Sequence, residues 1–421
     1  MATKEVDAMA RSRRPRPQRQ LPDVARLREL SGVRRPRLDR SAARVERAQS
    51  IGQLRVLARR RTPRAVFDYV DGAAEQEISL ARSRQLFRDI EFQPRVLRDI
   101  AVVDTATTVL GAPVSMPVVF GPTGFTRMMH HEGERAVGRA AATLGIPYAL
   151  STMGTVAPEQ LASEAPTLDR WFQLYVCRDR APMEELVSRA REAGYRALVL
   201  TVDTPVAGNR LRDVHNGLTI PPALTARTLV DVARHPAWWA NLATTAPLEF
   251  ATLSSFDGTV AELVGQLFDP SVTFEDLAAL RAMWDGPLIV KGIQSVDDAR
   301  AVVDHGADGL VVSNHGGRQL DRAPTPLRRL PEIVAAVGDR AEIYLDGGIT
   351  GGADVVAAIA HGARACLVGR AYLYGLMAGG QVGVERAGSI LRADIVRTMQ
   401  LLGVSSLDEL HPELVRLPGA P

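Results

Sequence analysis

The chain has 421 residues, 46% of them hydrophobic and 24% charged, with a formal net charge of +3. This length suits an α/β barrel of about 250 residues with extensions. The sequence contains no uncharged apolar run of the ~18 residues that a membrane-spanning helix needs, and its start lacks the apolar core of a secretory signal. The two cysteines, Cys177 and Cys366, exclude a disulfide framework and favour a reducing cytoplasm.

Residues 1–48 are predicted to form a disordered basic arm. Arginines crowd residues 11–47 among prolines, without the apolar periodicity of a helix. Such an arm could be attracted to anionic lipid, or it could serve only as a solubilising tail. Because it lacks interleaved aromatic residues and any nucleic-acid fold signature, no nucleic-acid partner is predicted.

Residues 49–421 are predicted to form a (β/α)8 TIM barrel. A helical pattern starts at Ser50, and eight short apolar runs follow from Met116 onward, most of them before a helical segment. The runs are MPVVFG, PYALST, WFQLYV, ALVLTVD, PLIVKG, GLVVSNHGG, EIYLDGG and ACLVGRAY. Near-continuous hydrophobicity indicates strands that are buried on both faces of a parallel sheet. Eight such units on one chain are typical of the barrel.

A long insertion interrupts the barrel pattern after the fourth predicted strand, at about residues 204–273. It is far longer than an ordinary connection between a strand and a helix, and it contains Trp238 and Trp239. At the catalytic end of a barrel, an insertion of this kind is commonly a lid or a docking surface. The paired tryptophans could pack on the outside of the barrel, or they could lie at a membrane interface.

Polar side chains gather where the predicted strands end. In this fold the carboxyl ends of the strands form the active-site rim, so polar residues at those positions are predicted to be functional. They are Thr123, Ser151, Gln173, Tyr175, Thr201, Asp203, Lys291, Ser313, His315, Arg318, Asp346 and Arg370.

The segment SNHGGRQLD carries the most informative of these residues. His315 is suited to act as a base near neutral pH, and a carboxylate from Asp203 would stabilise its protonated form. Arg318 offers a two-pronged donor for a substrate carboxylate. The alternatives are a helix N-cap for Asp203 and a surface ion pair with Asp321 for Arg318.

The remaining strand ends predict an anion site. Lys291 could form a Schiff base, bind phosphate or stabilise negative charge on a cofactor ring, unless it is only a solvated strand end. The motifs LDGG and VGR fall after the last two strands, where barrels bind phosphate. Their candidate phosphate-binding residues are Asp346, Gly347, Gly348, Gly369 and Arg370.

These motifs together resemble the FMN-dependent α-hydroxy-acid dehydrogenase and oxidase family. SNHGGRQLD is the most specific of them, and WFQLY, TVDTP, VKG and LDGG occur in the family's order. The resemblance runs from about Ser50 to the C-terminus. The segments GNRLRDVHNGLTIPPAL, HPAWW and NHGGRQLD are most similar to the respiratory, non-NAD L-lactate dehydrogenases.

The resemblance implies a role for each matching residue at the substrate. His315 would take a proton from the substrate, and Asp203 would stabilise the resulting imidazolium. Arg318 and Tyr69 would hold the substrate carboxylate, and Tyr175 would hydrogen-bond the substrate oxygen. An auxiliary positive charge would come from Arg210.

It also implies a bound FMN. Lys291 would lie against the flavin ring and stabilise its reduced anion, Asp346 would bind the ribityl hydroxyls, and Arg370 would reach the phosphate. The other residues implied to contact the cofactor are Pro122, Thr123, Gly124, Ser151, Gln173, Thr201, Ser313, Gly347, Gly348 and Gly369. No metal site is predicted.

The sequence departs from the family pattern at four positions. Met153 stands where plant glycolate oxidases carry Trp, and Cys177 replaces a Tyr that is common after WFQLY. Thr350 stands where many members have Arg, and Gly124 where many oxidases have Ala. These departures leave the shape of the substrate pocket, one phosphate contact and reactivity with oxygen open.

The function predicted from the sequence is oxidation of an L-2-hydroxy acid, L-lactate to pyruvate, with electrons passed to a quinone or other carrier. No GxGxxG follows a strand, so a dinucleotide domain is not supported. The alternatives are an oxygen-using oxidase or monooxygenase, an enzyme for another 2-hydroxy acid or a peptide-derived substrate, and a non-catalytic flavoprotein scaffold. A homotetramer is expected, in the cytoplasm or peripherally on the inner face of the cell membrane.

Overall fold

The structure, a computed structural model, describes residues 40–218, 225–253 and 268–418. Residues 1–39 of the predicted arm and parts of the predicted insertion lie outside these ranges. The expected boundary of the arm at residue 48 requires a correction, because helix α2 (Arg40–Arg47) falls inside it. Val45 and Ala48 are buried. Two small apolar residues among many arginines are too few to show helical periodicity in the sequence.

Eight parallel strands close into a barrel, which confirms the predicted fold. Each predicted apolar run supplies one strand, and β5, β7, β9 and β11 are buried along their whole length. The strands are β4 (Val118–Phe120), β5 (Tyr148–Ser151), β6 (Arg170–Leu174), β7 (Ala197–Thr201), β8 (Leu288–Ile293), β9 (Gly309–Ser313), β10 (Glu342–Asp346) and β11 (Ala365–Val368). Closure comes from β11, which pairs with both β10 and β4.

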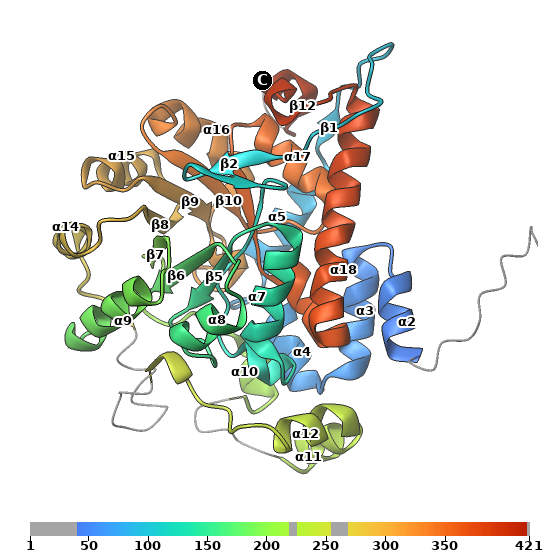
Figure 1. Cartoon of the computed structure of the whole chain (residues 1–421), viewed down its shortest axis with the longest axis vertical. Helices are drawn as coiled ribbons and strands as arrows, with labels where there is room; N and C mark the ends of the chain where they lie inside the picture. The colour runs from blue at the N-terminus through green and yellow to red at the C-terminus, as the bar shows by residue number, and fades with distance from the viewer. Residues whose placement is uncertain (1–39, 219–224, 254–267, 419–421) are drawn as a thin grey trace, which may run out of the picture. The chain divides into compact units, whose positions relative to one another are not determined.

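Helices surround the strands (Figure 1). Their inward faces pack on the outer side of the barrel, so the protein has one core inside the barrel and another around it. The helices of this layer are α7 (Gly133–Leu144), α8 (Pro158–Glu164), α9 (Ala181–Glu192), α14 (Phe274–Met283), α15 (Val296–Asp304), α16 (Pro326–Val337), α17 (Gly352–Ala360) and α18 (Arg370–Leu402). Cys177 and Cys366 are both buried and unpaired.

One end of the barrel is closed by a hairpin. Strands β2 (Thr107–Val109) and β3 (Ala112–Val114) pair antiparallel, and Val109 and Val114 join the apolar cluster inside the barrel. The hairpin lies where the strands begin, because the side chain of Glu342, the first residue of β10, accepts from the Leu110 amide. The carboxyl ends of the strands are therefore left for the site.

Besides α2, three described helices precede the barrel, and the last two contribute residues to the cavity at its open end. They are α3 (Ile51–Arg61), α4 (Arg64–Asp71) and α5 (Ile78–Arg88). The Ser50 hydroxyl caps α3 by accepting from the Gln53 amide. The short helix α6 (Thr126–Met129) follows β4. A small ladder joins β1 (Glu91–Phe92) to β12 (Val415–Arg416).

The predicted insertion is confirmed between β7 and α14. Its described parts contain α10 (Leu211–His215), α11 (Ala226–Ala233), α12 (Pro236–Ala243) and the 3-10 turn η1 (Ala251–Leu253). Helix α10 contacts α4, and α11 and α12 lie together beyond it at the lower edge of Figure 1. The two tryptophans differ: Trp238 packs on the core and donates to the Met128 carbonyl, whereas Trp239 is 44% exposed.

Candidate active site

A cavity of about 780 Å³ opens at the carboxyl ends of the strands. Most of the predicted site residues line it. These are Tyr69, Pro122, Thr123, Gly124, Ser151, Tyr175, Arg210, Lys291, His315, Arg318, Asp346, Gly347, Gly348, Gly369 and Arg370. Gln173, Thr201 and Ser313 are instead buried behind the lining, and Asp203 lies behind His315. The structure thus brings the predicted set together in two layers, one facing the cavity and one supporting it.

His315 and Asp203 form a hydrogen-bonded pair at the rim. The distance from His315 Nδ1 to Asp203 Oδ1 is 3.0 Å. The Asp203 side chain is 8% exposed. Burial alone would raise the pKa of Asp203, but the charges of His315 and Lys291 outweigh it and lower that pKa. An ionised carboxylate only accepts hydrogen bonds, so the imidazole donates from Nδ1 and keeps Nε2 free as a base. Asp203 is therefore not a helix cap.

The backbone of His315 is held in an unusual conformation. Its φ is 56°, a left-handed value that is rare for a residue other than glycine. The His315 amide donates to Ser313 Oγ at 3.0 Å, and Asn314 Oδ1 accepts from the Gly317 amide at 3.1 Å. These bonds offset the cost of the conformation, which is about 1–3 kcal/mol. Local strain maintained next to a hydrogen-bonded carboxylate is typical of a functional residue.

Lys291 is a buried cation rather than a solvated strand end. Its Nζ lies 3.2 Å from both Asp346 Oδ2 and Ser313 Oγ. Burial lowers the pKa of Lys291, but the carboxylates of Asp346 and Asp203 outweigh that effect and raise it. The ammonium group thus stays charged while it faces the cavity. A Schiff base would require it to lose that charge.

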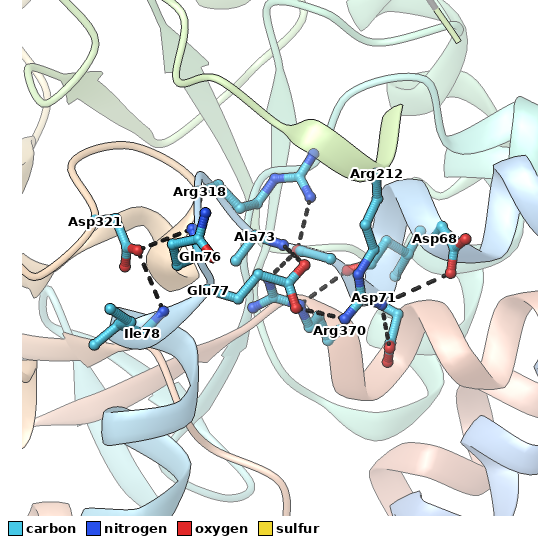
Figure 2. Close-up of polar contacts among 12 residues, drawn as sticks. Asp68, Asp71, Ala73, Gln76, Glu77, Ile78, Arg212, Arg318, Asp321 and Arg370 are labelled. Carbon is cyan, nitrogen blue, oxygen red and sulfur yellow. Dashed lines mark hydrogen bonds and ion pairs between the residues drawn. The ribbon is translucent and has the colours of Figure 1, made fainter. Parts of the chain in front are cut away.

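Among the residues that the structure describes, Arg318 has no carboxylate partner, and the surface ion pair with Asp321 does not form. Figure 2 shows Asp321 directed to the backbone where the α4–α5 loop meets the start of α5, and there it accepts from the amides of Gln76, Ile78 and Ser79. Arg318 Nη1 donates to the Tyr69 carbonyl. Burial, together with the charge of Arg210, lowers the pKa of Arg318 to about 10.

Two guanidinium groups lie close to the ring of Tyr69. The guanidinium carbon Cζ of Arg318 lies 4.9 Å from the centroid of the Tyr69 ring, and that of Arg210 lies 5.4 Å from it. Arg210 is paired with Asp213 at 2.6 Å, so its charge is balanced while that of Arg318 is not. A half-buried guanidinium without a counter-charge favours an anionic ligand, and a planar carboxylate matches its geometry.

Several observations fit the FMN that the resemblance implies. Gln173 Nε2 is buried without a hydrogen-bond partner, while its Oε1 accepts from Ser151, and a flavin carbonyl would satisfy that amide. At the opposite end, Arg370 donates only to the carbonyls of Val70, Gly72 and Gly316. Its guanidinium, too, has no carboxylate partner and suits a phosphate. Figure 2 shows Arg318 and Arg370 on either side of the α4–α5 loop.

An apolar wall covers the part of the cavity near Tyr175. It includes Phe125, Met128, Met153, Leu248 and Phe268. Burial raises the pKa of Tyr175, which keeps its hydroxyl protonated. Two departures from the family pattern meet here, because a Cβ added at Gly124 would lie 2.8 Å from Met153 Cβ. Gly124 therefore accommodates Met153.

Sequence reasoning missed two charged residues at the site. Arg84 lines the cavity, and Asp71 lies beneath it, bonded to Arg55 at 2.6 and 2.8 Å and to Tyr374 at 2.7 Å. Both stand on helices before the barrel, where strand-end patterns give no signal. A signal for Arg84 did exist, because it shares the inward face of α5 with Leu80 and Phe87.

Comparisons with known proteins agree with this geometry. The chain matches the family described as FMN-dependent dehydrogenase over residues 58–417. A Mycobacterium tuberculosis protein with the provisional name L-lactate dehydrogenase is 56% identical over 397 residues, covering 94% of this chain and 96% of that protein. An L-lactate dehydrogenase of Caulobacter sp. (strain K31) is 44% identical over 379 residues, with coverages of 87% and 98%.

A solved structure is also similar. The monotopic membrane protein (S)-mandelate dehydrogenase superposes with a TM-score of 0.84 at 38% identity, covering 88% of this chain and 100% of its own. Among the described residues of the present chain, no helix is long and apolar enough to cross a membrane. The same residues contain no cluster of His, Cys, Asp and Glu that could hold a metal ion.

Proposed function

The chain belongs to the FMN-dependent dehydrogenase family and oxidises an α-hydroxy acid, and we propose that its substrate is L-lactate and its product pyruvate. The observation that carries the proposal is the His315–Asp203 pair, which shares one cavity with Arg318, a cation lacking a carboxylate partner. Relatives that are 56% and 44% identical are named for L-lactate.

The substrate carboxylate is bound by Arg318 in this proposal. Its guanidinium group has no acidic partner among the described residues, and it contacts both the carbonyl and the ring of Tyr69. Arg210 adds a second positive charge above the same ring. These groups orient the α-carbon and its hydroxyl toward His315 and Tyr175, which line the same cavity.

His315 takes the proton that the substrate releases. Its free Nε2 is the acceptor, and the charge on Asp203 stabilises the imidazolium that results. The oxidation removes two electrons and two protons, of which His315 takes one proton; FMN, when bound, would accept the two electrons together with the second proton. Lys291 places its charge where negative charge accumulates on the reduced cofactor, and Asp346 and Ser313 hold its ammonium group there.

Anaerobic bleaching of the flavin tests the substrate. The purified protein is mixed with L-lactate, D-lactate, glycolate or (S)-mandelate, and the flavin absorbance is followed. We expect L-lactate to bleach the flavin fastest and D-lactate to leave it oxidised. Faster reduction by (S)-mandelate would assign the apolar wall to an aromatic substrate and overturn the choice of L-lactate.

The proposed electron acceptor is a quinone, reached by peripheral attachment to a membrane. Leu229 and Val230 on α11 are 56% and 52% exposed, and Trp239 on α12 is 44% exposed. Exposed apolar side chains with an interfacial tryptophan suit the headgroup region of a bilayer. A related structure is that of a monotopic membrane protein. The cytoplasmic face of the membrane and a homotetramer remain part of this proposal.

Liposome flotation tests the attachment. Vesicles containing anionic lipid are mixed with the wild type, with Trp239→Ala and with Trp238→Phe as the matched control, since Trp238 packs on the core. We expect flotation of the wild type and the control, and less flotation of Trp239→Ala. If the wild type stays with the soluble fraction at low salt, or if oxygen reoxidises the flavin as fast as a quinone does, the acceptor is oxygen.

A further inference from the structure

Arg84 is a cation in the cavity wall that the proposed reaction does not use. It stands in α5, it is half-buried, and it lines the cavity together with Gly348, Thr350 and Arg370. Within the part of the chain that the structure describes, its guanidinium group forms no hydrogen bond and no ion pair. A partly buried charge without a partner favours a ligand of opposite charge.

Helix α5 is fixed against the loop that follows β10. The backbone of Gly348 has a φ of 88°, and a Cβ added there would lie 3.0 Å from the Phe87 ring and 3.1 Å from Ser83 Cβ. Phe87 and Ser83 flank Arg84 on the helix. At the first turn of α5, Asp321 accepts from the amides of Ile78 and Ser79. The position of Arg84 is therefore set by packing and by a cap.

Arg84 and Arg370 concentrate positive charge at one end of the cavity. The three hydrogen bonds of Arg370 all go to carbonyl oxygens. Burial, with a contribution from the charge of Arg84, lowers the pKa of Arg370. No side chain caps the N-terminus of α18, which begins at Arg370. Two cations and an uncapped helix start suit a doubly charged phosphate.

Thr350 lines the same end of the cavity without contributing a charge. The family places an arginine at this position in many members, but the Thr350 hydroxyl is neutral and donates to Asp354 Oδ2 at 3.2 Å. The Thr350 amide donates to the same carboxylate at 2.7 Å. Thr350 stands just before Gly351, the N-cap of α17, and supplies no charge to the cavity it lines.

We propose that Arg84, from a helix outside the barrel, binds the FMN phosphate and replaces the cation missing at position 350. This inference rests on the assignment of FMN as cofactor. The competing role for Arg84 is structural, because its charge also lies near buried Asp71 and contributes, after Arg55 and Tyr374, to lowering the pKa of that carboxyl against the effect of burial.

The experiment compares two flavins that differ only in the phosphate. Dissociation constants of FMN and riboflavin are measured by fluorescence quenching on the flavin-stripped full-length chain. The proteins are the wild type, Arg84→Met and Arg82→Met, the last being the control because Arg82 is exposed on the same helix. We expect Arg84→Met to weaken FMN binding about 10- to 100-fold, as a lost charge-assisted contact does, and to leave riboflavin binding unchanged.

A rescue variant separates the two roles. If Arg84 replaces a cation at position 350, Thr350→Arg in the Arg84→Met background restores FMN affinity to within a few-fold of the wild type. Equal weakening of FMN and riboflavin, or no change for either, would overturn the inference. Failure of wild-type protein to bind FMN at all would instead contradict the cofactor assignment itself.

Discussion

The barrel rim and the insertion contribute to one cavity but are held in different ways. At the rim, Lys291, Asp346 and Ser313 bond to one another, and His315 bonds to Asp203. The described parts of the insertion are held by separate contacts to the rest of the chain, which include the Asp231 carboxylate accepting from the Arg64 amide at 2.6 Å and the Trp238 indole donating to the Met128 carbonyl. The two outer helices of the insertion, α11 and α12, bury no side chain completely among those described.

The insertion forms ion pairs with the rest of the chain near its start, and hydrogen bonds near the point where the chain leads back to the barrel. Arg212 of α10 pairs with Asp71 at 3.3 Å and also with Glu77, as Figure 2 shows. Arg127 donates to the Pro247 carbonyl at 3.0 Å. The segment between these ties carries the exposed apolar residues. The difference suits the division of labour that we propose, in which the barrel holds the cofactor and the catalytic base, and the insertion supplies Arg210 for the substrate and a surface for membrane attachment.

Removing the proposed base, His315, should have the largest effect on the reaction and tests the role of the barrel. His315→Gln should lower the rate of flavin reduction by L-lactate about 100-fold or more, since a general base contributes that much. FMN should remain bound at wild-type affinity, because His315 is paired with Asp203 and not with the phosphate end. Stopped-flow absorbance gives the rate. An unchanged rate would place the base on another residue.

Arg318→Lys keeps the charge of the carboxylate site but removes its planar fork. We expect kcat/KM for L-lactate to fall about 10- to 100-fold, with both KM and kcat affected, because lysine cannot make the paired bonds. Steady-state kinetics with an artificial acceptor measures both constants. Arg329→Lys, on the exposed face of α16 in an ion pair with Glu332, is the matched control. Kinetics equal to this control would contradict the assignment of Arg318.

Asp71→Asn breaks the ionic tie between α4 and the insertion. The pKa of Asp71 lies well below its ordinary value, since its bonds to Arg55 and Tyr374 outweigh burial. A carboxyl with a depressed pKa stabilises the fold above its unfolded pKa of about 4, and this contribution is lost as pH falls toward the folded value. We expect the variant to lose about 2 kcal/mol of unfolding free energy at pH 7.

The pH dependence of the unfolding free energy provides a control for that prediction. Between pH 5 and pH 3 the unfolding free energy of the wild type should fall more steeply than that of Asp71→Asn, because only the wild type has this carboxylate to protonate. Urea unfolding at each pH measures both slopes. Parallel slopes would mean that Asp71 is not the ionised partner of Arg55 and Arg212.

The two regions also differ in how far the sequence alone predicts them. Barrel strands are recognisable because a strand buried on both faces must be apolar throughout, and its first polar residue then falls at the rim, as with Lys291 and Ser313. Arg84 and Asp71 were missed because their roles depend on how helices outside the barrel pack against it. The same holds for Trp238 and Trp239, identical neighbours in sequence that packing separates into a buried contact and an exposed one.

Arg210→Gln gives the most direct test of the division of labour, since Arg210 comes from the insertion and points into the cavity. The measurement is one anaerobic titration of flavin reduction with L-lactate, made alongside the FMN dissociation constant of the same protein. The account predicts an apparent dissociation constant for L-lactate raised about 10-fold, with FMN affinity within twofold of the wild type. A comparable loss of FMN affinity, or an unchanged constant for L-lactate, would contradict it.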